Sequence, residues 1–187
     1  MFGLLFALTL GCIKPFPDAP KEVEETGYSD SPNLECAYWV GDRVCDFVRT
    51  ETSTGLPISL YDFSGSPIVL DLSAMWCGPC QTAAADTNNT VARYSDNNLR
   101  YITVLFEDLE GNHPDGADLQ LWVDNFGITE PVLASDYSLL NADSTQGFPL
   151  RAWPTFVLID EDLIIRERVE GYSQEILDEA IDRLIQN

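Results

Sequence analysis

The chain is poor in positive charge. Its 187 residues include 10 Lys and Arg against 31 Asp and Glu, which gives a formal net charge of −21. Such a surface repels phosphate backbones and anionic lipid headgroups, so we exclude nucleic acid as a partner. A well-solvated acidic surface is sufficient to explain the composition.

Histidine and cofactor-binding motifs are also scarce. The chain has a single His, His113, and a single CxxC pair, whereas a structural zinc site needs four ligands. No motif for an organic cofactor is evident. We therefore predict neither a metal nor a cofactor, and we expect His113 to be an exposed loop residue rather than a catalytic one.

Apolar runs long enough to span a bilayer are missing as well. Residues 1–12 (MFGLLFALTLGC) fall short of the roughly 20 residues required, but they suit the hydrophobic part of a secretion signal. The run ends in Gly11 and Cys12, which resembles the cleavage site of bacterial lipoproteins. We predict a lipidated Cys12 and an extracytoplasmic, membrane-anchored lipoprotein facing the periplasm; a plain cleaved signal is the alternative.

Residues 13–35 contain many Pro, Glu, Asp and Ser and few periodic apolar residues. Such a segment cannot bury enough apolar surface to offset the entropy of ordering, so we expect a flexible acidic tether. Residues 36–187 are long enough, and apolar enough, for one globular domain.

Within this domain, strand and helix patterns alternate, which indicates an α/β fold. The expected strands are 57–63, 68–74, 101–106, 155–160 and 163–169. The expected helices run from the CGPC stretch to about residue 94, over 116–126, and from a cap at Ser173 to the end. Asn88 and Asn89 are poor helix formers, so the far end of the first helix is uncertain.

The stretch SAMWCGPCQT (73–82) carries the chemistry. A thiolate attacks a disulfide, and a cysteine at a helix amino terminus has its charge stabilised by unpaired amides and the helix dipole. Cys77 is in that position, Gly78 and Pro79 suit the first turn, and Cys80 lies one turn on, where it can resolve a mixed disulfide. We expect a redox-active pair.

Asp71 interrupts the otherwise apolar strand 68–74. A buried carboxylate is costly unless it is neutralised or has a function. A structural, hydrogen-bonded aspartate is the alternative. Trp76 is expected to form an exposed wall beside the cysteine pair, with a core position as its alternative.

With WCGPC at a strand-to-helix junction and Trp153-Pro154-Thr155 before a late strand, residues 40–187 resemble thioredoxin-fold proteins, in particular the extracytoplasmic thiol-disulfide oxidoreductases of the TlpA/ResA type. The resemblance implies a thioredoxin-like three-layer sandwich, with a central mixed β-sheet flanked by helices and an N-terminal β extension.

The resemblance also implies residue roles. Asp71 takes the proton of Cys80, directly or through water, with a raised pKa. Pro154 has a cis peptide bond and, with Trp153 and Thr155, helps the backbone bind an extended client segment.

The chain departs from the family at two positions that affect the redox properties of the cysteine pair and the environment of the buried aspartate. Ala83 stands where such proteins often carry glutamate, so a specific role in cytochrome maturation is not implied. Strand 101–106 lacks the lysine that thioredoxins place beside the buried aspartate.

Two further cysteines remain, Cys36 and Cys45. They are candidates for a structural disulfide, with two buried free thiols as the alternative. Their pairing agrees with an oxidising compartment.

The predicted function is the reduction or exchange of disulfides in extracytoplasmic proteins. The partners are disulfide-containing or dithiol clients and a membrane electron donor or acceptor, because the chain has no cofactor motif. Two other classes stay open: a thiol peroxidase, although Ala74 stands where those enzymes place Thr or Ser, and a non-catalytic binding protein or metallochaperone.

Overall fold

A computed structural model of the chain describes residues 36–52, 54–141 and 146–186. The predictions for Cys12, for residues 1–12 and for residues 13–35 lie outside these residues.

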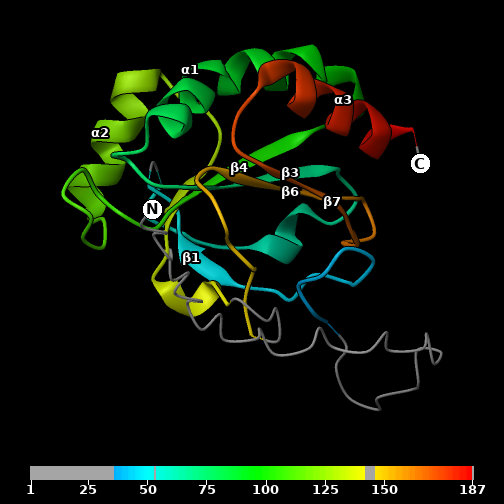
Figure 1. The fold of residues 1–187 in the computed structure, drawn as a ribbon, viewed down its shortest axis with the longest axis horizontal. Coiled ribbons are helices and arrows are strands. Elements are labelled where there is room, and N and C mark those ends of the chain that lie inside the picture. The colour runs from blue at the N-terminus through cyan, green and yellow to red at the C-terminus, as the bar shows by residue number, and fades with distance from the viewer. Residues whose placement is uncertain (1–35, 53, 142–145, 187) are drawn as a thin grey trace, which may run out of the picture. The chain divides into compact units, whose positions relative to one another are not determined.

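A five-stranded mixed sheet forms the centre, in the order β5-β4-β3-β6-β7 (Figure 1). Its strands are β3 (Ile68–Ser73), β4 (Arg100–Leu105), β5 (Val132–Ala134), β6 (Thr155–Ile159) and β7 (Ile165–Glu170). β3, β4 and β5 are parallel, whereas β6 runs antiparallel to both β3 and β7. The predicted mixed sheet is confirmed.

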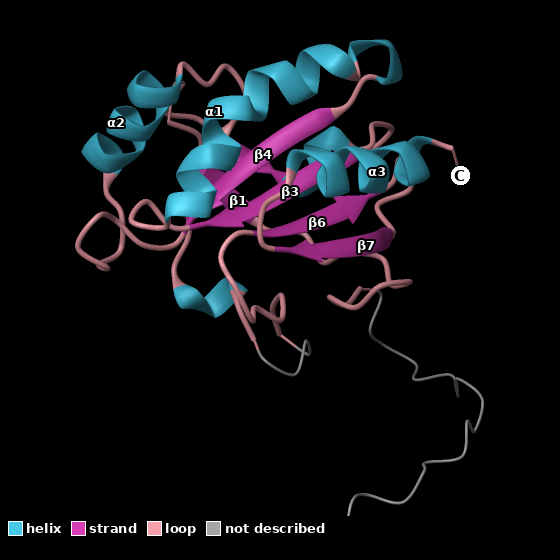
Figure 2. Ribbon diagram, turned by 45° about the horizontal axis from the view of Figure 1, so that its top comes forward, coloured by secondary structure: helices cyan, strands magenta, loops and turns pink. Residues whose placement is uncertain are grey.

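Helices flank this sheet, as predicted (Figure 2). α1 (Gly78–Arg93) and α3 (Gln174–Ile185) pack on one face, and α2 (Gly116–Phe126) packs on the edge strand β5. The other face is covered mainly by residues 36–63, which include the hairpin-like pair β1 (Val48–Thr50) and β2 (Pro57–Ser59). This pair is the predicted N-terminal β extension.

Strand β3 is buried along its whole length, as expected for a central strand. Because successive side chains point to opposite faces, Ile68, Leu70 and Leu72 join the cluster under the N-terminal extension. Val69 joins the cluster under α1 and α3. Asp71 therefore faces the helices.

The strand predicted over 57–63 is wrong beyond Ser59. Leu60–Phe63 form a 3-10 helix, η1. Ser59 Oγ accepts from the Tyr61 N–H at 3.1 Å, and the Asp62 carboxylate accepts from the Ser59 N–H at 2.9 Å. This capping box ends the strand and starts the helical turn.

Helix α1 continues through Asn88 to Arg93 without a break. Asn88 Nδ2 donates to the Gly127 carbonyl at 2.6 Å, and Asn88 Oδ1 accepts from the Thr129 N–H at 3.2 Å. The side chain thus ties α1 to the end of α2, which offsets its poor helix propensity. At α3, Ser173 occupies the predicted cap position, but its side chain makes no capping hydrogen bond.

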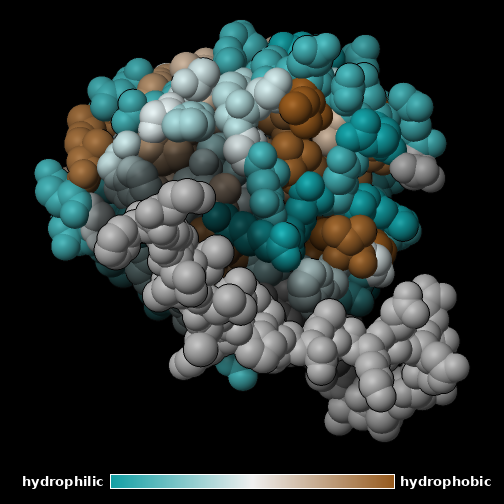
Figure 3. Space-filling model, in the orientation of Figure 1, coloured by the Kyte–Doolittle hydropathy of each residue, from teal (hydrophilic) through white to brown (hydrophobic). Residues whose placement is uncertain are grey.

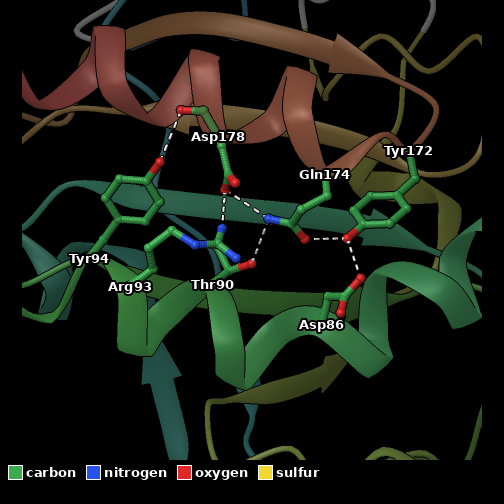
Figure 4. A network of polar contacts seen from close by, with 7 residues as sticks. All are labelled: Asp86, Thr90, Arg93, Tyr94, Tyr172, Gln174 and Asp178. Carbon is green, nitrogen blue, oxygen red and sulfur yellow. Dashed lines mark hydrogen bonds and ion pairs between the residues drawn. The ribbon is translucent and has the colours of Figure 1, made fainter.

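A polar network joins α1 to α3 over the sheet (Figure 4). Arg93 forms an ion pair with Asp178, and Gln174 donates to both Thr90 Oγ1 and Asp178. Nearby, the Tyr172 hydroxyl donates to the Asp86 carboxylate at 2.8 Å. These contacts fix α3 against the helix that begins at the cysteine pair.

We predict opposite effects at the two neighbouring asparagines of α1. Asn88→Ala should lower the free energy of unfolding by about 1 kcal/mol, because hydrogen bonds to Gly127 and Thr129 are lost. Asn89→Ala, at an exposed position, should raise it by up to about 0.5 kcal/mol through better helix propensity. Urea unfolding of the oxidised protein measures both, and equal values would contradict the anchoring role of Asn88.

Candidate active site

Cys77 and Cys80 are joined by a disulfide at the start of α1. Cys77 is the helix N-cap, and its Sγ accepts from the Cys80 N–H at 3.2 Å. In the reduced protein the same amide stabilises a negative charge on this sulfur. The predicted redox pair is therefore in the predicted place.

Both cysteines are buried in the oxidised protein. Cys77 is 4% exposed and Cys80 is fully buried, while Gly78 and Pro79 between them are exposed. Pro79 lies in the first turn, where the missing N–H costs no helical hydrogen bond. Cys77 is therefore the member of the pair that keeps some exposed surface.

The segment Trp153-Pro154-Thr155 reaches the same site. The Trp153–Pro154 peptide bond is cis, as the resemblance implied. Trp153 packs against the cluster that contains Cys77 and Cys80. Thr155 is buried, and its hydroxyl donates to the Ala152 carbonyl at 2.8 Å, which closes the turn before β6.

Trp76 is 48% exposed, as expected for a wall beside the pair. Glu107, in the segment after β4, holds it: one carboxylate oxygen accepts from the Trp76 indole N–H, and the other accepts from the Tyr137 hydroxyl. The Glu107 carbonyl also accepts from the Met75 N–H at 2.9 Å. Glu107 therefore fixes two exposed aromatic rings beside the motif.

Asp71, on the helix-facing side of β3, is fully buried, and both of its carboxylate oxygens are hydrogen-bonded. Oδ1 accepts from the Ser73 hydroxyl at 2.5 Å, and Oδ2 accepts from the Tyr101 hydroxyl at 3.2 Å. Tyr101 in turn is hydrogen-bonded to the hydroxyl of Thr87 on α1. Two buried hydroxyl groups thus hold the Asp71 carboxyl group, and a third, from Thr87, supports Tyr101.

Burial raises the pKa of Asp71 to about 7, and the hydrogen bonds from Ser73 and Tyr101 oppose this rise only in part. A carboxyl group with this pKa gains or loses a proton near neutral pH, which is a requirement for a general base. The role of Asp71 toward Cys80 stays a prediction, because within the described residues its hydrogen bonds go to Ser73 and Tyr101.

The remaining candidates lie apart from this site. Cys36 and Cys45 form a disulfide, so the alternative of two free thiols is wrong. His113 is exposed, as expected. Across 36–52, 54–141 and 146–186, no cluster of three or more His, Cys, Asp or Glu side chains is arranged to hold a metal ion, and no helix is long and apolar enough to cross a membrane.

A hollow of about 320 Å³ lies next to the motif, lined in part by Met75 and Gln81, which flank it in sequence. Leu109 and Leu121, both exposed, form part of its wall. Figure 3 shows a mostly hydrophilic surface with separate apolar patches, one of them over α2, the helix that carries Leu121.

A family model described as the AhpC/TSA family matches residues 40–168. The chain belongs to the AhpC/TSA family. This AhpC/TSA member is 27% identical over 140 residues to the thioredoxin-like protein YneN of Bacillus subtilis, which covers 75% of this chain and 76% of YneN. It is 24% identical over 139 residues to the thiol-disulfide oxidoreductase ResA of Oceanobacillus iheyensis, covering 72% and 66% of the two chains.

Solved structures share the fold of this AhpC/TSA member. A thiol:disulfide interchange protein of the thioredoxin family from Chlorobium tepidum superposes with a TM-score of 0.62 at 16% identity, covering 84% of this chain and 99% of the other. The exposed lipoprotein thioredoxin Etrx1 of Streptococcus pneumoniae superposes with a TM-score of 0.59 at 23% identity, covering 76% and 100%. The TlpA/ResA-type resemblance and the thioredoxin-like fold are confirmed.

Five residues of this site are not predicted from the sequence: Ser73, Thr87, Tyr101, Glu107 and Tyr137. The strand pattern could have identified Ser73, because residues i and i+2 of a strand share a face and Asp71 is itself a candidate. The other four meet their partners only through the fold.

We predict that Asp71 makes the protein less stable as the pH rises. Between pH 3.8, the ordinary pKa of an aspartate, and about 7, the folded state binds one proton more than the unfolded state. The free energy of unfolding should therefore fall by about 1.4 kcal/mol per pH unit across this window, relative to Asp71→Asn.

Urea unfolding of both proteins between pH 4.5 and 8 measures this difference. The free energy of unfolding of Asp71→Asn should increase relative to that of the wild type as the pH rises, and the difference should become constant above about pH 7. Asp96→Asn, at an exposed position, is the control and should follow the wild type. Parallel curves for the wild type and Asp71→Asn would contradict the raised pKa.

Proposed function

We propose that this protein is a membrane-tethered thiol-disulfide oxidoreductase that reduces disulfides of extracytoplasmic proteins. The observation that carries this proposal is the Cys77–Cys80 disulfide at the first turn of α1, where Cys77 keeps a small exposed surface and Cys80 is fully buried. The names of the relatives, which include a thiol-disulfide oxidoreductase, support it.

The reaction has two steps. The Cys77 thiolate attacks a client disulfide, forms a mixed disulfide and releases one client thiolate. Cys80 then attacks Cys77 Sγ, which re-forms the Cys77–Cys80 disulfide and releases the second client thiolate. The client disulfide gains two electrons, and the dithiol loses two.

Client binding falls to the surface around Cys77. The exposed face of Trp76, the half-buried Trp153 and the hollow lined by Met75 can contact apolar side chains next to the client cysteine. The backbone before Pro154 is exposed at Arg151 and Ala152 and can pair with an extended client segment.

Membership of the AhpC/TSA family favours one second candidate, a thiol peroxidase. The residues argue against it. Ala74, three residues before Cys77, is buried and has no hydroxyl with which to hold a peroxide. Cys80 one turn away gives instead the arrangement of a dithiol that exchanges with disulfides.

The anchor and the electron source complete the proposal. Cys12 after an apolar run supplies a site for lipidation, and the similar Streptococcus pneumoniae protein is described as an exposed lipoprotein thioredoxin. Gly78 and Pro79 between the cysteines resemble the insert of reducing thioredoxins. Electrons would come from a membrane donor.

We expect Cys77→Ser to abolish reduction of insulin disulfides by the full chain, because Cys77 is the thiol that attacks the client disulfide. Cys80→Ala should accumulate mixed disulfides with clients, visible as adducts that a reductant removes. The double variant Cys36→Ser, Cys45→Ser is the matched control and should retain reduction, because this pair lies outside the site.

Two outcomes would overturn the proposal. One is insulin reduction that survives in Cys77→Ser. The other is peroxide consumption by the reduced wild type at a rate equal to or above its reduction of disulfides, which would establish the peroxidase instead.

We further expect the anchor to depend on Cys12. In a bacterial host that processes lipoproteins, the full chain should appear in the membrane fraction and incorporate labelled palmitate. Cys12→Ala should lose both properties. The variant Cys36→Ser tests the specificity of the labelling and should remain lipidated, whereas label retained by Cys12→Ala would refute the lipid anchor.

A further inference from the structure

We propose that Ser73 carries the proton between Cys80 and Asp71, and that Tyr101 is a positioning residue that holds Asp71 for this transfer. The inference rests on the proposed function and deepens it, since it concerns how the same dithiol is resolved. It gives a role to the buried hydroxyl groups of Ser73 and Tyr101, which the sequence analysis did not identify as site residues.

The register of the sheet places Ser73 nearer to the disulfide than Asp71. β3 runs toward Cys77, so Ser73, two residues beyond Asp71 on the same face, lies closer to the start of α1. Both side chains are fully buried, and the Ser73 hydroxyl donates to Asp71 Oδ1 at 2.5 Å.

Packing places Cys80 over the same end of the sheet. Leu105 is the partner of Ser73 in the register of β3 and β4. Leu105 belongs to the same buried cluster as Cys80 and Ala84, the next residue along that face of α1. The Ser73–Leu105 pair therefore lies in the row of the sheet that borders the cluster holding Cys80, and the Asp71–Thr103 pair is the row behind it.

Tyr101 holds the far side of the carboxyl group. Its hydroxyl donates to Asp71 Oδ2 at 3.2 Å and is itself hydrogen-bonded to Thr87. With Oδ2 engaged, Oδ1 is the oxygen that faces Ser73. This division gives Tyr101 an orienting role without contact with the sulfurs.

The transfer balances in atoms and charge. In the mixed disulfide, the Cys80 thiol gives its proton to Ser73 Oγ while Ser73 gives its own proton to Asp71 Oδ1. The Cys80 sulfur forms a bond to Cys77 Sγ, and the bond between Cys77 Sγ and the client sulfur breaks. The client leaves as a thiolate and takes a proton from water; Asp71 later returns its proton to water.

The groups around Asp71 allow its carboxyl group both to gain and to lose a proton. The titratable group in contact with Asp71 in the described part of the chain is Tyr101 from β4, and Tyr172, before α3, lies behind Tyr101. Cys80 on α1 belongs to the cluster next to Ser73's partner Leu105. From β6, the facing residue is the apolar Phe156. None of these groups is a cation that would hold Asp71 permanently ionised.

The experiment measures one step only, the attack of Cys80 on the mixed disulfide. The reduced full chain is mixed with Ellman's reagent in a stopped-flow instrument, and the second release of thionitrobenzoate is timed from pH 5 to 9. Cys80→Ser identifies this second phase, because it lacks the phase. The first release reports attack by Cys77.

Variants of Ser73 and Tyr101 distinguish proton transfer through Ser73 from the positioning of Asp71 by Tyr101. Ser73→Ala should lower the plateau rate of the second phase at high pH by about 100-fold, the low end for general acid-base catalysis. Tyr101→Phe should keep the plateau rate but move the midpoint of the pH profile upward by about 1 unit, because a hydrogen bond to the ionised carboxylate is lost.

Thr103→Val is the matched control. Thr103 faces the same side and pairs with Asp71 in register, but its buried hydroxyl has no hydrogen-bond partner among the described residues. Its loss should change neither plateau nor midpoint. Ser73→Thr, which keeps a hydroxyl, should restore most of the plateau rate.

An unchanged first phase and an unchanged circular dichroism spectrum show that each variant is folded. A wild-type plateau in Ser73→Ala, or a Tyr101→Phe profile without a shifted midpoint, would overturn the proposal. If the wild type shows no second phase and does not reduce insulin, the proposed function itself fails. If it does both and Ser73→Ala matches it, only the proton path is wrong.

Discussion

The first turn of α1 is the constraint on which the site depends. Cys77 ends the loop as the N-cap, and the amide of Cys80 donates to its sulfur, so a single helix terminus both orients the pair and stabilises charge on one member. The rest of the fold holds that turn in place. β3 delivers the chain to it, α3 is tied to the same helix by the network of Figure 4, and Trp153 packs against the cluster behind it.

Burial of Asp71 in β3, the strand that leads to this turn, gives the site its second property. Among the described residues its partners are neutral hydroxyl groups, so desolvation dominates and raises the pKa of Asp71 to about 7. The stability that the folded state loses when Asp71 ionises is the cost of keeping a proton acceptor in a dry interior. The same hydrogen bonds that reduce this cost also fix which carboxylate oxygen faces Ser73 and which faces Tyr101.

Sequence reasoning succeeded where chemistry is local. The cysteine pair, the helix start, the buried aspartate and the proline before Thr155 all have signatures within a few residues. Features that depend on tertiary contacts could not be predicted from the sequence. Three-residue strands such as β1 and β5 have too few positions for periodicity to appear, Asn88 is kept in its helix by Gly127 from a distant turn, and Tyr101 meets Asp71 only through the register of two parallel strands.

The way the N-terminal extension joins the sheet has a consequence for orientation. The Val44 and Gly41 amides donate to the carbonyls of Leu163 and Ile165, at the turn between β6 and β7. Because β6 runs antiparallel to β3, this turn lies at the pole of the sheet opposite the reactive sulfurs. Under the proposed anchoring through Cys12, the tether would therefore join the domain at the end of the sheet away from the cysteine pair, which leaves the Cys77 end accessible to clients.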